Sequence, residues 1–161
     1  MSDPRGRPTW DRYYLNIARE ASTRSNCIRR QVGALVVKRK SIISTGYNGT
    51  PIGVRNCFDG GCLRCQSDAP PGESYDTCVC VHAEQNAIVL AARRGNSVAG
   101  GTLYSTLRPC FGCLKESIQA GIEKIVFGEV MSYPPALEDV YQNLVAQTHL
   151  ELEAFEPDGR Q

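Results

Sequence analysis

The sequence has no long apolar run, and no stretch approaches the roughly 20 residues that a membrane-spanning helix requires. The first residues, MSDPRGRPTW, are polar and lack the apolar centre of a secretory signal peptide. The formal net charge is only +1, so no basic excess favours a nucleic-acid partner. We therefore expect a cytoplasmic protein that associates with neither membrane nor nucleic acid.

No glycine-rich phosphate loop of the Walker type is present either, which excludes the P-loop mode of nucleotide binding. Hydrophobic residues make up 42% and charged residues 22% of the chain, as in ordinary globular proteins. A length of 161 residues suits one domain with a single core. We expect that domain to span 1–161, with a core of about 10–155 and a frayed tail at 156–161.

Cysteine, in contrast, is abundant, with eight residues in the chain. In a protein without an export signal, metal ligation explains so many cysteines better than disulfides do. One cysteine is isolated at Cys27, five lie within 57–80, and two form a Cys-x-x-Cys pair at Cys110 and Cys113. The sequence therefore predicts metal sites rather than a disulfide framework.

Hydrophobic periodicity and turn residues predict an ordered series of helices and strands. Gly95 and Gly121 mark the ends of the second and third helices. The predicted series is a helix at 10–23, strands at 31–37 and 41–47, helix 82–95, strand 101–106, helix 110–121, strand 124–130, helix 136–148 and strand 150–156.

This order predicts an α/β fold. The first two strands form an antiparallel hairpin around a solvated KRK turn, and the later strand–helix–strand alternation implies parallel pairing. We expect a three-layer α/β/α sandwich around a mixed sheet of about five strands. Residues 48–80 are rich in Gly, Pro, Asp and Cys without periodicity. So long a loop needs an organiser, and we expect an insertion that a metal holds together.

Two short motifs carry the chemistry, each at the start of a predicted helix. They are His82-Ala83-Glu84 and Pro109-Cys110-Phe111-Gly112-Cys113. One imidazole and two thiolates make three zinc ligands, which leaves the fourth position of a catalytic zinc for water. Glu84 cannot point the same way as His82, but it can lie near the open position and move protons. This is the zinc-deaminase signature, in which the glutamate is a general acid/base and not a ligand.

Other readings of the motifs exist. His82 and Glu84 could be ordinary residues of a helix start without metal, and the Cys-x-x-Cys could be a pair of buried thiols or a redox pair. Each motif alone is weak. The two in this order, each before a helical pattern, favour a zinc deaminase.

On these residues the sequence resembles the zinc-dependent cytidine/deoxycytidylate deaminase superfamily, and within it the deoxycytidylate (dCMP) deaminases. The resemblance runs from about Arg24 to Tyr133 and implies the cytidine deaminase-like fold. The segments that carry it are RSNC (24–27), QVGALVV (31–37), GYNGTPIG (46–53), NCFDGGCLRC (56–65), CVCVHAEQNAI (78–88) and TLRPCFGCLKESIQAGIEKIVF (106–127).

The resemblance implies roles for individual residues. His82, Cys110 and Cys113 match the catalytic zinc ligands, and Glu84 matches the proton shuttle. The implied substrate contacts are Asn48 to the sugar, the backbone N–H of Ala83 to the pyrimidine carbonyl, and Tyr133 by stacking on the base. Arg93 matches an arginine linked to the nucleotide response of related enzymes. For Arg93 and Tyr133, a solvated arginine and a partly buried tyrosine are equally good interpretations.

The resemblance also implies a structural zinc, for which Cys27, Cys57 and Cys80 match three ligands. The fourth ligand stays open among Cys62, Cys65 and Cys78. Since Cys62-x-x-Cys65 has zinc-knuckle spacing, the six thiols could even serve two structural metals. Reduced thiols that merely fill gaps are the alternative.

The function that this resemblance implies is hydrolytic deamination of dCMP to dUMP and ammonia, which supplies dUMP for thymidylate synthesis. It also implies a homo-oligomer, regulation by dCTP and dTTP, and magnesium bound with the regulatory nucleotide. Candidates for the phosphate contact are Asn48 and its neighbours in GYNGTP, and arginines such as Arg24 or Arg55. Two alternatives stay open. One is a zinc deaminase for dCTP, modified dCMP, cytidine or an RNA base, and the other is a non-catalytic zinc scaffold.

Overall fold

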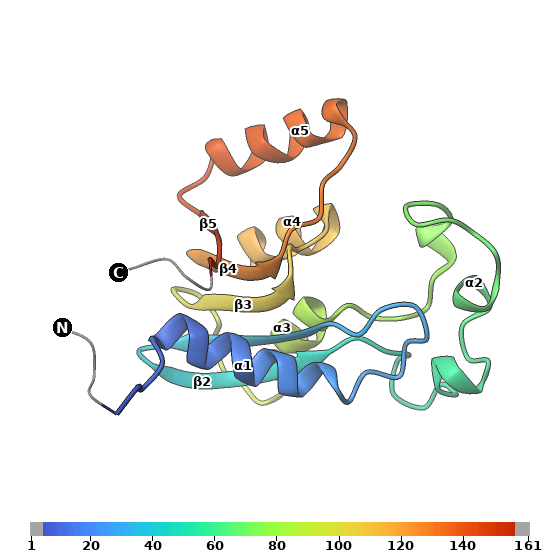
Figure 1. Ribbon diagram of the computed structural model, residues 1–161, viewed down its shortest axis with the longest axis horizontal. Coiled ribbons are helices and arrows are strands. Elements are labelled where there is room, and N and C mark those ends of the chain that lie inside the picture. Colours follow the sequence, from blue (N-terminus) through green and yellow to red (C-terminus); the bar gives the residue numbers. More distant parts are fainter. Residues whose placement is uncertain (1–4, 157–161) are drawn as a thin grey trace.

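The structure, a computed structural model, describes residues 5–156 and contains one five-stranded sheet with helices on both faces (Figure 1). Along the chain, the longer elements are α1 (Trp10–Ser22), β1 (Gly33–Lys38), β2 (Ser41–Tyr47), α3 (Ala83–Arg93), β3 (Thr102–Leu107), α4 (Phe111–Gln119), β4 (Lys124–Glu129), α5 (Pro135–Ala146) and β5 (Glu151–Ala154).

The strand order is β2-β1-β3-β4-β5. Strand β1 pairs antiparallel with both β2 and β3, whereas β3, β4 and β5 are parallel. The predicted mixed sheet of five strands is therefore confirmed. The hairpin turn at Arg39 and Lys40 has positive φ angles of 51° and 63°. Such angles match the twist of the flanking strands, and both side chains are exposed, as expected for a solvated turn.

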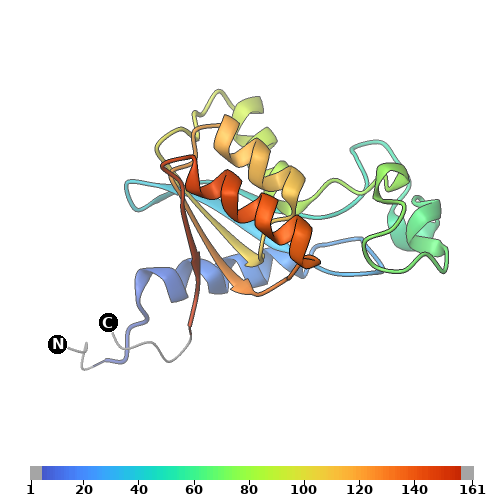
Figure 2. The ribbon, with the colours of Figure 1, turned by 90° about the horizontal axis from the view of Figure 1, so that it is seen from above.

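Helices cover both faces of the sheet, so the predicted three-layer architecture is also confirmed (Figure 2). Strand β1 shows why, because its side chains alternate between two apolar cores. Leu35 and Val37 join the core beneath α1, and Ala34 and Val36 join the core beneath α3 and α4. A strand buried on both faces has the continuous apolar sequence seen in QVGALVV.

The four long helices are found where they were predicted, with boundaries that move by at most two residues. His82 and Cys110 are the N-cap residues of α3 and α4 rather than their first helical residues. Gly95 and Gly121 follow the C-caps with φ angles of 73° and 80°, a conformation that glycine adopts without steric cost. The predicted tail beyond Glu156 lies outside the described residues.

The segment 48–80 projects beyond one end of the sheet (Figures 1 and 2). The sequence predicts a long loop here, and the structure adds three single turns of helix to it, η1 (Cys57–Asp59), α2 (Leu63–Gln66) and η2 (Tyr75–Thr77). Elements of three or four residues are too short to show periodicity, which is why the sequence pattern missed them. In the described part of the chain, no helix is long and apolar enough to cross a bilayer.

Candidate active site and metal centres

His82, Cys110 and Cys113 meet where the N-termini of α3 and α4 approach each other. His82 Nδ1 lies 3.3 Å from Cys110 Sγ and 3.4 Å from Cys113 Sγ, and the three ligand atoms lie within 4.8 Å of one another. Tetrahedral zinc with ordinary Zn–N and Zn–S bonds places two such ligand atoms about 3.5 Å apart. The donor set and its spacing therefore fit a zinc ion without rearrangement.

The local electrostatics favour the thiolate form of Cys110, which is one of the ligand forms that a metal needs. Hydrogen bonding with Cys113 lowers the pKa of Cys110, although burial opposes this, and hydrogen bonding with Cys110 raises the pKa of His82. The backbone N–H of Cys113 also points to Cys110 Sγ, at 3.5 Å, as the first turn of α4 permits. A metal takes the thiolate and the neutral imidazole, so metal binding competes with protonation of His82.

Glu84 lies on the first turn of α3 and is almost fully buried, with 4% of its surface exposed. Ser105 on β3 donates a hydrogen bond of 2.9 Å from its hydroxyl to Glu84 Oε1. Burial raises the pKa of Glu84, while the nearby charge of His82 and the Ser105 hydroxyl act to lower it. A buried carboxyl group with a raised pKa suits a residue that must both take and return a proton.

Sequence reasoning missed Ser105, although a signal existed. It is fully buried in the apolar strand β3, where a serine needs a polar partner. A serine at an inward position of the strand next to α3 could have been recognised as a contact of the buried carboxylate.

Ala83 follows the metal ligand His82 in the chain, whereas the Asn48 side chain bonds to the segment just before β1. Its Oδ1 accepts hydrogen bonds from the Ser25 hydroxyl and from the backbone N–H of Val32, and its Nδ2 donates to the Arg30 carbonyl. Its side chain holds the start of β1. Ala83, the first residue of α3, is fully buried. The sugar and pyrimidine contacts of these two residues stay predictions.

A bridge between Gly49 and Val81 brings the GYNGTP segment beside the start of α3. The two residues exchange backbone hydrogen bonds of 3.1 and 2.8 Å. Nearby, Gly46 allows β2 to touch α3, because an added Cβ would meet the Ala83 carbonyl oxygen at 2.2 Å. These close backbone contacts are what places the predicted substrate segment next to the metal ligands.

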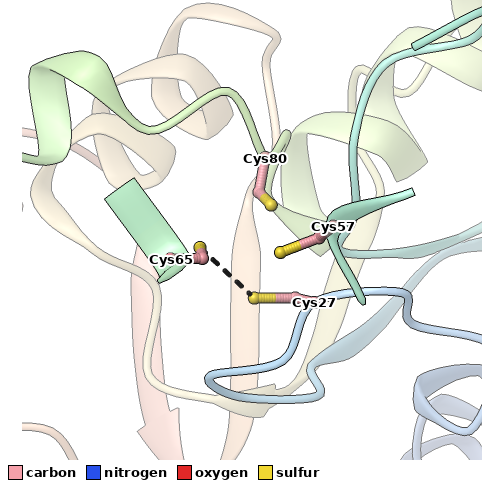
Figure 3. Close-up of side chains that lie close together, drawn as sticks. All are labelled: Cys27, Cys57, Cys65 and Cys80. Carbon is pink, nitrogen blue, oxygen red and sulfur yellow. Dashed lines mark hydrogen bonds between the residues drawn. The ribbon is translucent and has the colours of Figure 1, made fainter. Parts of the chain in front are cut away.

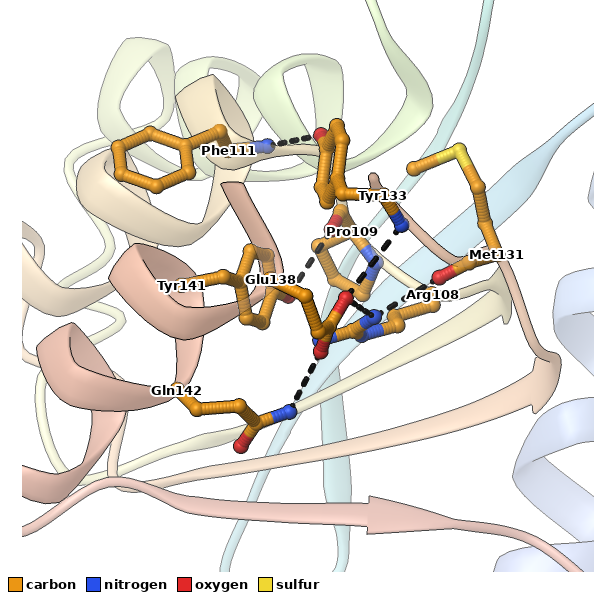
Figure 4. Close-up of polar contacts among 8 residues, drawn as sticks. All are labelled: Arg108, Pro109, Phe111, Met131, Tyr133, Glu138, Tyr141 and Gln142. Atoms are coloured by element: carbon orange, nitrogen blue, oxygen red, sulfur yellow. Dashed lines mark hydrogen bonds and ion pairs between the residues drawn. The ribbon is translucent and has the colours of Figure 1, made fainter. Parts of the chain in front are cut away.

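Tyr133 lies near the other ligand helix (Figure 4). Its hydroxyl accepts a 2.8 Å hydrogen bond from the backbone N–H of Phe111, one of the free N–H groups at the start of α4. Its ring contacts Tyr141, with 5.9 Å between ring centroids. Stacking on a base stays a prediction.

Arg93 is exposed in the last turn of α3, and its regulatory role also stays a prediction.

Arg108 and Glu138 form an ion pair that sequence analysis did not foresee (Figure 4). The guanidinium is buried and donates two hydrogen bonds to the carboxylate, at 2.7 and 2.9 Å, and one to the Met131 carbonyl. It also lies 4.0 Å from the ring centroid of Tyr141, whose hydroxyl donates to the Pro109 carbonyl. Helix α5 therefore holds the segment just before the first cysteine ligand.

The other six cysteines gather around the segment 48–80. The Sγ atoms of Cys27, Cys57, Cys65 and Cys80 lie within 4.8 Å of one another (Figure 3). In this group Cys65 stands beside the three predicted ligands as the fourth, which the sequence left open among three cysteines. A second group, which consists of Cys62, Cys65, Cys78 and Cys80, meets the same distance limit.

Comparisons with known proteins agree with this geometry. Residues 8–129, more than half of the chain, match the family described as the cytidine and deoxycytidylate deaminase zinc-binding region. Deoxycytidylate deaminase of Schizosaccharomyces pombe is 45% identical over 129 residues, which is 79% of this chain but 39% of the relative. This chain therefore spans about two fifths of the length of that fungal protein. Deoxycytidylate deaminase of Mycobacterium phage D29 is 44% identical, covering 75% of this chain and 95% of the relative.

Among solved structures, the dCMP deaminase of the cyanophage S-TIM5 in complex with dCMP and dUMP is similar, with a TM-score of 0.71 and 33% identity. The match covers 92% of this chain and 98% of that chain. It confirms the predicted fold. The chain belongs to the family of cytidine and deoxycytidylate deaminases that carry a zinc-binding region.

Proposed function

We propose that the chain catalyses the hydrolytic deamination of dCMP to dUMP and ammonia. The observation that carries this proposal is the buried Glu84 carboxylate, which lies two residues from His82 and is oriented by Ser105. A purely structural zinc site has no use for such a carboxylate. The names of the similar fungal and phage proteins support the choice of dCMP.

In this proposal His82, Cys110 and Cys113 hold the catalytic zinc. When bound, the zinc supplies Lewis-acid activation of the attacking water. Glu84 takes a proton from that water and passes it to N3 of cytosine, which makes C4 more electrophilic. The water oxygen bonds to C4, and Glu84 then takes the second proton from that oxygen and gives it to the amine. As the C4–N bond breaks, a C4 carbonyl remains and ammonia leaves.

The surroundings of Glu84 support this double role. Because burial penalises the charged carboxylate, the neutral form of Glu84 is favoured relative to it, and the side chain can hold the proton between the two transfers. Because Ser105 fixes one oxygen, the other oxygen is the one available to the reacting groups. Asn48, the Ala83 N–H and Tyr133 are proposed as the contacts to the sugar and base.

The remaining features belong to the same proposal. A structural zinc bound by Cys27, Cys57, Cys80 and a fourth cysteine would organise the segment 48–80 within one domain of about 10–155. The enzyme would be a cytoplasmic homo-oligomer that supplies dUMP for thymidylate synthesis. It would respond to dCTP and dTTP, with magnesium bound beside the nucleotide and Arg93 involved in the response.

A substrate panel tests the proposal. Ammonia release is measured with the zinc-loaded chain on dCMP, dCTP, deoxycytidine and cytidine, each with and without dCTP and magnesium as activator. We expect dCMP to give the highest kcat/KM. Preference for dCTP or for a nucleoside would reassign the substrate within the family. No ammonia from any cytosine compound would overturn the proposed function.

A further inference from the structure

The segment 48–80 has sulfur where a protein domain normally has an apolar core. Its large apolar side chains face outward, and Ile52 and Leu63 are each 84% exposed. The buried cluster at its centre instead consists of cysteines, together with the half-buried Cys78: Cys27, Cys57, Cys62, Cys65 and Cys80. A segment of this kind cannot draw its stability from apolar burial, so another interaction has to hold it together.

The six sulfur atoms form two overlapping groups of four. Cys27 and Cys57 belong to the first group only, and Cys62 and Cys78 to the second group only. Cys65 and Cys80 belong to both. Within each group, every pair of Sγ atoms lies within 4.8 Å. No cysteine of the six is left outside this arrangement.

The measured distances match the edges of zinc tetrahedra. Four sulfurs at about 2.3 Å from a zinc ion lie about 3.8 Å from one another. In the first group, Cys27 Sγ lies 3.9 Å from Cys65 Sγ (Figure 3). In the second group, Cys78 Sγ lies 3.8 Å from Cys62 Sγ and 3.9 Å from Cys65 Sγ. Distances of this size occur in both groups, and the remaining pairs stay within 4.8 Å.

We propose that the six cysteines bind two zinc ions as a thiolate-bridged pair, in which Cys65 and Cys80 each contact both ions. Cys27 and Cys57 complete the coordination of one ion, and Cys62 and Cys78 that of the other. Each zinc then has four sulfur ligands, as a closed structural site needs. A single zinc would use either group and leave two closely spaced thiols unused.

The net negative charge of such a cluster can be offset by two neighbouring arginines. Six thiolates and two zinc ions leave a net charge of about −2, the same as one zinc with four thiolates. Two arginines next to the cluster have neutral oxygen partners. Arg29 donates from Nε to the Cys65 carbonyl at 3.0 Å, and the buried Arg64 donates to the carbonyls of Pro70 and Glu73. Their positive charges are therefore available to offset the cluster.

Zinc content tests the proposal independently of activity. The full chain, expressed with zinc and desalted, should contain three zinc ions, one at His82 and two in the cluster. The variant His82→Ala should keep two. Cys57→Ala and Cys62→Ala should each lose one ion, because the opposite group stays complete. Cys65→Ala and Cys80→Ala should each lose both cluster ions, because each removes a ligand from both groups.

Two zinc ions per wild-type chain, with two thiols that react readily in the native state, would overturn the proposal. So would a three-zinc protein in which no single cysteine variant loses both cluster ions. If the bridging variants do not fold, X-ray absorption at the zinc edge of the wild-type protein decides. Edge-sharing tetrahedra place the ions about 3 Å apart, so a zinc neighbour at that distance is expected. Its absence would contradict the bridged pair. Loss of deamination with the cluster zinc intact would affect only the proposed function.

Discussion

The Ser105 hydroxyl on β3 donates a hydrogen bond of 2.9 Å to Glu84 Oε1 on α3. This contact links the central sheet to the group that is proposed to move protons. In the proposed mechanism it leaves the other carboxylate oxygen for the reacting atoms. Because the pair is buried, water cannot replace the serine when it is removed.

Ser105→Ala should lower kcat on dCMP by about 10-fold to 100-fold, the value of one hydrogen bond to a charged group. The KM and the zinc content should change little, since the hydroxyl donates its hydrogen bond to Glu84 and not to a metal ligand. The matched control is Ser44→Ala, which removes another buried hydroxyl that donates to α3, at the Ala87 carbonyl. That variant should lose stability but keep kcat. Equal kcat losses in both variants would show that Ser105 has no special role.

Glu138→Gln should destabilise the protein by about 2–3 kcal/mol in urea unfolding at pH 7, because the buried Arg108 loses its charged partner. The Arg108 hydrogen bonds lower the pKa of Glu138 to about 2, from an ordinary value of 4.5. The stabilisation is therefore complete above about pH 4.5 and is lost as the pH falls toward 2.

The difference in stability between wild type and Glu138→Gln should accordingly shrink over that range. The control is Glu129→Gln, which breaks an exposed pair with Arg30 and should cost less than about 1 kcal/mol. A difference between wild type and Glu138→Gln that stays constant from pH 5 to pH 3 would contradict the ion-pair explanation.

Tyr133→Phe separates two roles of one side chain. The phenylalanine keeps a ring for base stacking but cannot accept the hydrogen bond from the Phe111 N–H. We expect a loss of about 1 kcal/mol in stability and an unchanged KM for dCMP. Tyr133→Leu should in addition raise KM, since the ring is gone. An unchanged KM in Tyr133→Leu would remove the stacking role.

Gly46→Ala should destabilise the fold by about 3 kcal/mol, because the new Cβ would meet backbone atoms of α3 that cannot move alone. The closest atoms are the Ala83 carbonyl oxygen at 2.2 Å and the Ala87 nitrogen at 2.5 Å. Gly112→Ala is the control. Its nearest atom is Cys110 Sγ at 3.9 Å, so thermal unfolding should change by less than about 1 kcal/mol. A stable Gly46→Ala protein with normal activity would contradict this tight contact.

The sequence predicted most of the fold, because its strongest signals are local. The apolar run of β1 and the glycines at 95 and 121 mark elements that depend on nearby residues alone. The spacing within the His82 and Cys110 motifs likewise indicates a zinc site. No local pattern indicates the ion pair of Arg108 and Glu138, because the pair depends on how α5 returns across the sheet after β4.

The cysteines show the same limit. Spacing alone could not choose among Cys62, Cys65 and Cys78, because a segment without apolar periodicity gives no rule for its path. The structure brings all three to the cluster and makes Cys65, with Cys80, common to both groups. The sequence therefore led to a search for one fourth ligand, whereas all three cysteines belong to the cluster.

The most direct test of the central claim is ammonia release from dCMP by Glu84→Gln, measured beside its zinc content. The control is Glu20→Gln, which changes an exposed glutamate on α1 far along the chain from the motifs. The proposed role predicts that Glu84→Gln keeps its zinc and loses at least about 100-fold in kcat, whereas the control behaves as wild type. Near wild-type turnover by zinc-loaded Glu84→Gln would contradict it.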